Sequence, residues 1–304
     1  MLQVKLNYKK QAIICRVGEQ EIYGVAFIPQ PRRRTPLAIF AHELGANHNS
    51  GVPYAEMLAE SGVAAYTFDF RGGSATSRSD GSTDSMSVMT EAEDICAVLD
   101  AAKTWDFVDS DRIVLFGASQ GGAASAIAAA RRQDEICALM LLYPALVTYE
   151  AVHETYNSLD EVPEEFWVGD LIHVGRRFVS DSWDHDIFAD MPGFKKPVLL
   201  LHGDEDEVID ISYSEQAAGA YPDCEFHVIH GAGHGFRDAR FDEAAGYICN
   251  FLRSHGLLPT EAKGRPGGPH LIVISQKTSF PDEVKPHNVT DKASRKCYYS
   301  NNDA

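Results

Sequence analysis

The sequence predicts an α/β fold, with a mostly parallel central sheet and helices on both faces. Short apolar runs of strand length alternate with segments of helical periodicity between residues 37 and 255. Several of these runs end in loops that hold serine, histidine or aspartate, as expected at the functional edge of such a sheet. The 304 residues include 44% hydrophobic amino acids, which is enough for the core of one large domain.

The N-terminal residues are expected to add antiparallel strands to this sheet. Residues 11–17 and 20–28 flank Gly18-Glu19, a pair that suits a hairpin turn. Further buried strands are predicted by apolar runs at residues 37–41, 63–70, 113–116, 137–143, 197–201 and 225–229. Helices are predicted between them, at residues 52–61, 86–103, 123–130, 212–221 and 241–255.

Residues 147–194 break the alternation of strands and helices. The segment is acidic and rich in aromatic side chains, among them Trp167 and Phe178. We interpret it as a small cap inserted into a domain of residues 1–255; the alternative is a pair of connecting helices whose aromatics belong to the core. The composition changes after residue 255, so residues 256–304 are expected to be a tail outside the fold, with one candidate edge strand at residues 270–274.

The net charge of the chain argues against two classes of binding partner. A formal net charge of −17 and a pI near 5.0 argue against nucleic acid and against an anionic membrane surface. No apolar run approaches the roughly 20 residues of a membrane helix, and the first residues lack a signal-peptide pattern. The six cysteines form no C-x-x-C pair. We therefore expect a cytoplasmic protein with no membrane partner.

The strongest chemical signal lies between residues 112 and 122. An apolar strand runs into Gly117-Ala-Ser-Gln-Gly121, which fits the G-x-S-x-G pattern of a nucleophile elbow. Small residues flank Ser119 because the turn from strand to helix is too tight for large ones. The alternative is a Gly/Ser turn without chemical meaning, so the other loops must decide between these interpretations.

A serine nucleophile needs a base, and the base needs an acid that fixes its tautomer. The order serine, aspartate, histidine along this chain is that of α/β-hydrolases. Residues 202–208, H-G-D-E-D-E-V, resemble the acid loop of that superfamily, and residues 231–234, G-A-G-H, resemble its histidine loop. This resemblance selects Asp206 over Asp204 as the acid and His234 as the general base and acid that serves Ser119.

Acyl transfer also needs hydrogen-bond donors for the oxyanion. One backbone N–H belongs to Gln120, the residue after the nucleophile. The other is expected from the loop after the strand at residues 37–41, where Leu44 is our choice. His42-Glu43 opens this loop like an H-E-x-x-H metal motif, but residue 46 is alanine, so no metal is expected.

Residues 37–255 as a whole resemble α/β-hydrolases, and most of all the bacterial cinnamoyl and feruloyl esterases. The likeness rests on the elbow, the acid and histidine loops, Phe68-Asp-Phe-Arg71 and Tyr143-Pro-Ala145. It implies the α/β-hydrolase fold with an inserted cap, and a serine carboxylesterase that cleaves hydroxycinnamate esters, such as ferulates or chlorogenate, through an acyl-enzyme. No organic cofactor is implied, the partner is a small-molecule ester, and a homodimer is kept as a hypothesis.

The sequence departs from these esterases at two places. The family's H-G-F loop reads His42-Glu43-Leu44 here, and Phe178-Val179 stand nearest to a cap tyrosine of the family. We expect Glu43, Trp167 and Phe178 to contact the substrate. A general short-chain carboxylesterase, a serine peptidase of the acylaminoacyl or dipeptidyl type, and a catalytically silent binding module remain the alternatives.

Overall fold

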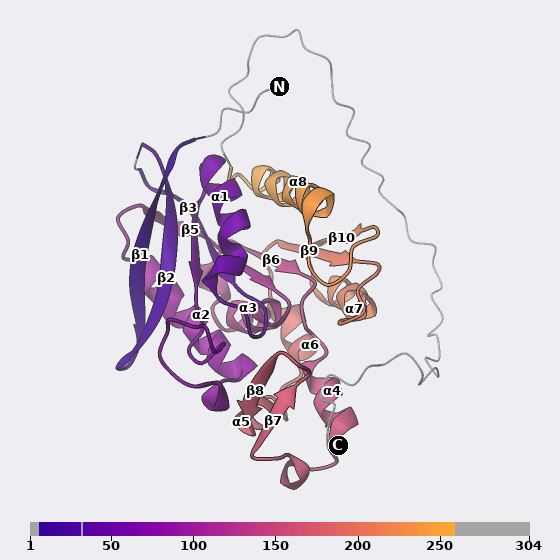
Figure 1. The fold of residues 1–304 in the computed structure, drawn as a ribbon. Helices are drawn as coiled ribbons and strands as arrows, with labels where there is room; N and C mark the ends of the chain where they lie inside the picture. The colour runs from indigo at the N-terminus through magenta and orange to yellow at the C-terminus, as the bar shows by residue number, and fades with distance from the viewer. Residues whose placement is uncertain (1–5, 32, 259–304) are drawn as a thin grey trace, which may run out of the picture.

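The computed structural model describes residues 6–31 and 33–258 of the chain (Figure 1). Its centre is an eight-stranded sheet in the order β1-β2-β4-β3-β5-β6-β9-β10. The hairpin of β1 (Tyr8–Val17) and β2 (Gln20–Pro29) joins β4 in antiparallel orientation, and the remaining strands run parallel to one another. The predicted α/β class with a mostly parallel sheet is therefore confirmed.

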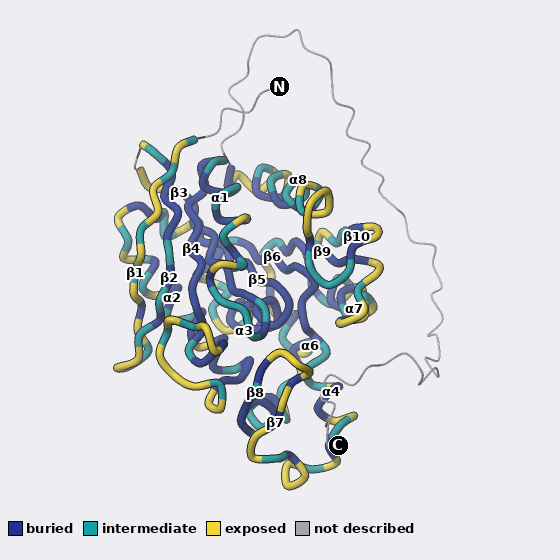
Figure 2. Tube along the Cα trace, in the orientation of Figure 1, coloured by how far each residue is buried: buried dark blue, intermediate teal, exposed yellow. Residues whose placement is uncertain are grey.

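The central parallel strands are buried on both faces. The parallel strands are β3 (Thr35–Ala41), β4 (Ala64–Phe68), β5 (Val108–Ala118), β6 (Ala138–Leu142), β9 (Val198–Gly203) and β10 (Cys224–Ile229). Every residue of β3, β4, β6 and β9 is buried, which explains why these strands read as continuous apolar runs. Figure 2 shows this buried centre and the more exposed strands β1 and β10 at the two edges of the sheet.

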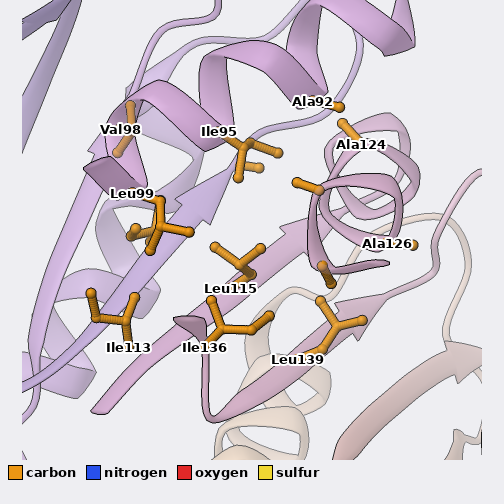
Figure 3. Packing of buried hydrophobic residues seen from close by; sticks show 14 of the residues in the cluster. Ala92, Ile95, Val98, Leu99, Ile113, Leu115, Ala124, Ala126, Ile136 and Leu139 are labelled. Atoms are coloured by element: carbon orange, nitrogen blue, oxygen red, sulfur yellow. The ribbon is translucent and has the colours of Figure 1, made fainter. Parts of the chain in front are cut away.

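Five helices cover the two faces of the sheet. Those on one face are α1 (Val52–Glu60) and α8 (Asp238–Ser254), and those on the other are α2 (Val88–Ala102), α3 (Gln120–Arg131) and α7 (Ser212–Ala220). The side chains of one strand alternate between these two faces. In β5, Ile113 and Leu115 belong to the cluster with α2 and α3, whereas Val114 and Phe116 belong to the cluster with α1 and α8. Figure 3 shows Leu115 between the helices of the first cluster. We call the sheet with these five helices the main domain.

The 147–194 segment is built from shorter elements. They are α4 (Thr148–Thr155), η4 (Leu159–Glu161), β7 (Glu165–Val168), β8 (Ile172–Gly175), α5 (Arg177–Ser180), α6 (Ile187–Asp190) and η5 (Met191–Gly193). Strands β7 and β8 pair antiparallel in a separate two-stranded sheet, and with α4 and α5 they form a group at the bottom of Figure 1. A third hydrophobic cluster lies in this group and includes Leu44 and Met86 of the main domain. The segment therefore packs against the loop that follows β3.

Short 3₁₀ turns and a capping box complete the main domain. The turns are η1 (His48–Gly51), η2 (Thr83–Ser85) and η3 (Gln133–Glu135). Helix α2 begins at Ser87, whose hydroxyl accepts from the Thr90 N–H, while the Thr90 hydroxyl accepts from the Ser87 N–H. The Ser87 hydroxyl also donates to Asp181 at 2.7 Å, which ties the start of α2 to the 147–194 segment.

The described residues end at Leu258, shortly after α8. Leu257 and Leu258 are buried, and their N–H groups donate to the Leu252 carbonyl. The rest of the predicted tail, including the candidate strand at residues 270–274, lies outside the described residues. No helix in the described part of the chain combines the length and the apolar character that crossing a membrane would need.

Candidate active site

Ser119 stands on a strained corner between β5 and α3. Its φ of 51° and ψ of −121° lie where residues with a side chain are rare. Gly117 and Gly121 permit the corner: a Cβ at Gly117 would overlap the Gly121 carbonyl, and one at Gly121 would overlap the carbonyl oxygens of Ala41 and His42. The two glycines of the G-x-S-x-G pattern thus have a steric reason in this chain.

The structure brings Ser119, His234 and Asp206 into one hydrogen-bonded row. His234 Nε2 lies 2.9 Å from Ser119 Oγ, and His234 Nδ1 lies 2.8 Å from Asp206 Oδ2. The three side chains follow β5, β9 and β10, so they come from the carboxyl ends of three parallel strands. In this geometry Nδ1–H can donate to Asp206, which leaves Nε2 free to accept the serine proton.

Asp206 is held as a carboxylate by its surroundings. Burial alone would raise its pKa, but hydrogen bonds from His202 and His234 and from the Ile209 N–H outweigh burial and hold that pKa well below its usual range. Asp206 Oδ1 also accepts the N–H groups of Val208 and Ile209, at 2.8 and 2.9 Å. A negative charge therefore faces His234.

A second aspartate–histidine pair lies in the same two loops. Asp204 Oδ2 is 2.6 Å from His230 Nδ1, and Asp204 Oδ1 accepts the Gly231 N–H. The His230 side chain is 80% exposed, whereas Asp206 is completely buried. Between the two aspartates, only Asp206 is bonded to the histidine that meets Ser119.

His42 and His48 shape the loop after β3. His42 Nδ1 lies 2.7 Å from the Glu43 carbonyl, and the Phe70 N–H donates to His42 Nε2 at 3.3 Å, so the ring is a neutral Nδ1–H tautomer. Burial lowers the pKa of His42, in agreement with this tautomer. His48 Nδ1 bonds Asp69 Oδ1 at 2.6 Å, a buried contact that the sequence did not reveal.

The two expected oxyanion donors are the backbone N–H groups of Leu44 and Gln120. Gln120 is the first residue of α3, and Leu44 is 8% exposed in the loop after β3. Within residues 6–31 and 33–258, neither N–H donates to a backbone carbonyl in a loop, turn or cap. An oxyanion hole requires two such donors, and the assignment of Leu44 and Gln120 stays a prediction.

Tyr143 also lies beside His234, although the sequence alone assigns it no role. It follows β6, and its ring packs edge-on against His234 with centroids 4.9 Å apart. Its hydroxyl donates to Glu43 Oε1 at 3.1 Å. The signal that could have found it is its position at the carboxyl end of a parallel strand.

The aromatic residues predicted to contact substrate differ in exposure. Trp167 on β7 is 58% exposed and touches the His173 ring, with centroids 5.4 Å apart. Phe178 on α5 is buried in the third cluster, where its ring meets Phe166. The hairpin that carries Trp167 reaches the loop after β3, because a Cβ at Gly45 would lie 3.7 Å from the Leu171 carbonyl. Substrate contact by Trp167, Phe178 and Glu43 stays a prediction.

No metal centre is present in the part of the chain that the structure describes. No cluster of three or more histidine, cysteine, aspartate or glutamate side chains there is arranged to hold an ion.

Comparisons with known proteins place this site in a family and a fold. The profile of the Prolyl oligopeptidase family matches residues 53–255, more than half of the 304 residues. Est1E from Butyrivibrio proteoclasticus, solved with ferulic acid bound, matches with a TM-score of 0.74 and 26% identity, over 80% of this chain and 99% of that one. Mouse alpha/beta hydrolase domain-containing protein 10 matches with a TM-score of 0.67 and 21% identity, over 80% of this chain and 99% of that one. These likenesses confirm the predicted α/β-hydrolase fold.

A curated relative covers a smaller part of the chain. An uncharacterized 31.7 kDa protein encoded in the traX-finO intergenic region of Escherichia coli is 33% identical over 111 residues. The match spans 36% of this chain and 38% of that protein. It supports relatedness over that stretch alone.

Proposed function

The chain belongs to the prolyl oligopeptidase family of α/β-hydrolases, and within it we propose a serine carboxylesterase whose nucleophile is Ser119. The observation that carries the proposal is the position of His234, 2.9 Å from Ser119 and 2.8 Å from a buried Asp206. A serine hydrolase is the class that this family and fold support.

The proposed reaction proceeds through an acyl-enzyme. Ser119 Oγ attacks the ester carbonyl while His234 Nε2 takes its proton, and Asp206 stabilises the resulting imidazolium. The N–H groups of Leu44 and Gln120 donate to the oxyanion. His234 then returns the proton to the leaving alkoxide. In the second half, His234 activates a water molecule that releases the acid and frees Ser119.

We propose hydroxycinnamate esters, such as ferulates or chlorogenate, as the substrates. Est1E, which resembles this chain at 26% identity, was solved with ferulic acid bound. An aromatic acyl group also suits a site bordered by the 147–194 segment, where we propose that Trp167 and Phe178 contact the ring. Aromatic side chains supply large apolar contact areas for such rings.

Initial rates on three esters test this proposal. Methyl ferulate and chlorogenate should be cleaved with a kcat/KM at least tenfold above that for p-nitrophenyl butyrate. Activity confined to p-nitrophenyl butyrate would leave a general short-chain carboxylesterase. Ser119→Ala should abolish turnover of all three esters and labelling by a fluorophosphonate probe. A wild-type protein that the probe does not label would instead indicate a silent binding module.

A serine peptidase of the acylaminoacyl or dipeptidyl type is the second candidate. The observation in its favour is the prolyl oligopeptidase family profile over residues 53–255. Acyl-peptide and dipeptide nitroanilides test it, because amide cleavage through Ser119 releases a chromophore. Turnover of these substrates above that of the esters would replace the esterase proposal. The homodimer stays a prediction, which light scattering of the purified protein can test.

A further inference from the structure

The Glu43 carboxylate lies in the loop that carries a proposed oxyanion donor. Glu43 comes directly before Leu44, and its Oε1 accepts the Tyr143 hydroxyl at 3.1 Å. Its Oε2 is buried and has no hydrogen-bond partner among the described residues. The Tyr143 bond is therefore the hydrogen bond that fixes the orientation of this carboxylate. Removing this bond would leave the carboxylate, whose Oε2 is already buried without a partner, with no hydrogen bond at all, which would be costly.

Tyr143 is itself held rigidly next to the base. Its N–H donates to the Leu201 carbonyl at 2.7 Å, and its φ of 36° is a left-handed value that few residues with a side chain adopt. Its ring lies edge-on to His234 and Phe236, with centroids 4.9 and 5.0 Å away. Burial raises the pKa of Tyr143 well above its usual value, so its hydroxyl keeps the proton that it donates to Glu43.

The Tyr143 side chain thus contacts both the base and the loop that carries the proposed oxyanion donor. The ring of Tyr143 contacts the base, and its hydroxyl is bonded to the residue before the oxyanion donor Leu44. The loop after β3 and the loop after β10 belong to different strands, and the sheet order places β5, β6 and β9 between these strands. A rigid link between them fixes the distance from the Leu44 N–H to the Ser119–His234 pair.

We propose that Glu43 and Tyr143 are positioning residues, and that their hydrogen bond sets the oxyanion donor Leu44 in register with His234. The inference rests on the proposed roles of Ser119, His234 and Leu44, and is separate from any contact of Glu43 with substrate. Oxyanion donors act only within a narrow range of distances, and small displacements reduce the rate strongly. The bond should therefore affect the chemical step more than substrate binding.

The rate at which a fluorophosphonate probe labels Ser119 tests the inference without assuming an ester substrate. Tyr143→Phe removes the hydroxyl but keeps the ring on His234, and Glu43→Leu removes the acceptor. Each should slow labelling about tenfold. Glu43→Gln keeps an amide oxygen that can accept the Tyr143 hydroxyl, so it should label faster than Glu43→Leu.

The double variant Glu43→Leu/Tyr143→Phe separates a shared bond from two independent effects. If one bond carries the effect, the double variant should label as slowly as either single variant. Tyr221→Phe is the matched control, because Tyr221 is buried in the hydrophobic cluster on the other face of the sheet from Tyr143. It should label like wild type. Equal labelling rates for Tyr143→Phe and wild type, or fully multiplicative losses in the double variant, would overturn the inference.

Ester kinetics and melting curves exclude a merely structural effect. On p-nitrophenyl butyrate, Tyr143→Phe should lower kcat about tenfold with KM unchanged, and the full fraction of protein should still become labelled at long times. A fall in the labelled fraction, with a normal rate for the fraction that remains, would mean misfolding and refute positioning. Wild-type protein that labels but cleaves no ester would remove the esterase proposal and leave the labelling test in force.

Discussion

The main domain and the 147–194 segment bury their hydrophobic side chains in different ways. The main domain places strands between two layers of helices, and α8 alone has 17 residues. In the segment, α5 and α6 have four residues each, and the two strands also have four. Three of the five exposed large hydrophobic residues among the described ones belong to the segment, namely Leu159, Trp167 and Leu171. For its length, the segment therefore exposes more large hydrophobic side chains than the main domain does.

This difference assigns separate tasks to the two regions. Ser119, His234 and Asp206 all stand on loops of the main domain, whose layers hold them rigidly. The segment contacts the loop after β3, and the bond from Ser87 to Asp181 ties it to the start of α2. We infer that loops of the main domain carry out the chemistry, whereas the segment selects the substrate and supports the Leu44 side chain. The following predictions test this division, from the largest expected effect to the smallest.

The sharpest contrast is between aspartates of the two regions. Asp206→Asn should lower kcat by roughly 10⁴, because the histidine then loses the partner that fixes its tautomer. Asp181→Asn in the segment should leave kcat within about threefold of wild type. Asp204→Asn, which changes the neighbouring aspartate–histidine pair, is the control within the acid loop and should also stay near wild type. Steady-state kinetics on one ester measures all three, and a large loss in Asp181→Asn would end the proposed division.

The two aromatic residues of the segment should respond differently to truncation. Phe178→Ala leaves a cavity in the third cluster and should cost about 3–5 kcal/mol of unfolding free energy. Trp167→Ala, at a side chain that is 58% exposed, should cost less than about 0.5 kcal/mol. Urea unfolding measures both values. In kinetic assays Trp167→Ala should raise KM for methyl ferulate but not for p-nitrophenyl butyrate, and unchanged KM values would remove Trp167 from the substrate contacts.

Glycine substitutions compare the backbone of the main domain with that of the 147–194 segment. Gly121→Ala should cost about 2 kcal/mol, because its methyl group would overlap the carbonyl oxygens of Ala41 and His42. Gly169→Ala in the β7–β8 turn has free space but a φ of 55°, and should cost about 1 kcal/mol. Gly193→Ala has free space and no such φ, so it should cost nothing measurable. A larger loss of stability for Gly169→Ala than for Gly121→Ala, measured by denaturant midpoints, would contradict the greater rigidity of the main domain.

A buried acid of the main domain should make stability depend on pH. Burial raises the pKa of Glu91 on α2 from 4.5 to about 8. The folded protein then keeps a proton that the unfolded chain loses between these values, so stability falls as pH rises from about 4.5 to 8. Glu91→Gln should lose this dependence and gain roughly 3 kcal/mol on wild type between pH 5 and pH 8.

Melting temperatures of wild type and Glu91→Gln at the two pH values measure this effect. Glu165→Gln on the segment, where the side chain is 60% exposed, is the control and should shift the melting temperature equally at both. If the difference in melting temperature between Glu91→Gln and wild type becomes smaller as pH rises, the predicted direction of the pH dependence is wrong.

The sequence predicted the parts of the site that local sterics determine. The glycines around Ser119 are required by the turn itself, so their pattern can be read without a structure. Tyr143 could not be assigned, because its contact with His234 depends on the sheet order, in which β9 alone separates β6 from β10. The pair β7–β8 was also missed, since four-residue strands are too short for a clear period of two. The burial of Glu91 ran against the usual exposure of charged residues.

Leu44 belongs to two structures at once. Its backbone is proposed to bind the oxyanion, and its side chain is one of the buried residues of the cluster that the segment forms. Any opening of the segment that exposes this cluster withdraws support from Leu44. Molecules in which the segment has opened locally should therefore be inactive. Their amide protons would exchange faster, but they would not contribute to turnover. A ligand that closes the segment would then raise both protection and rate together.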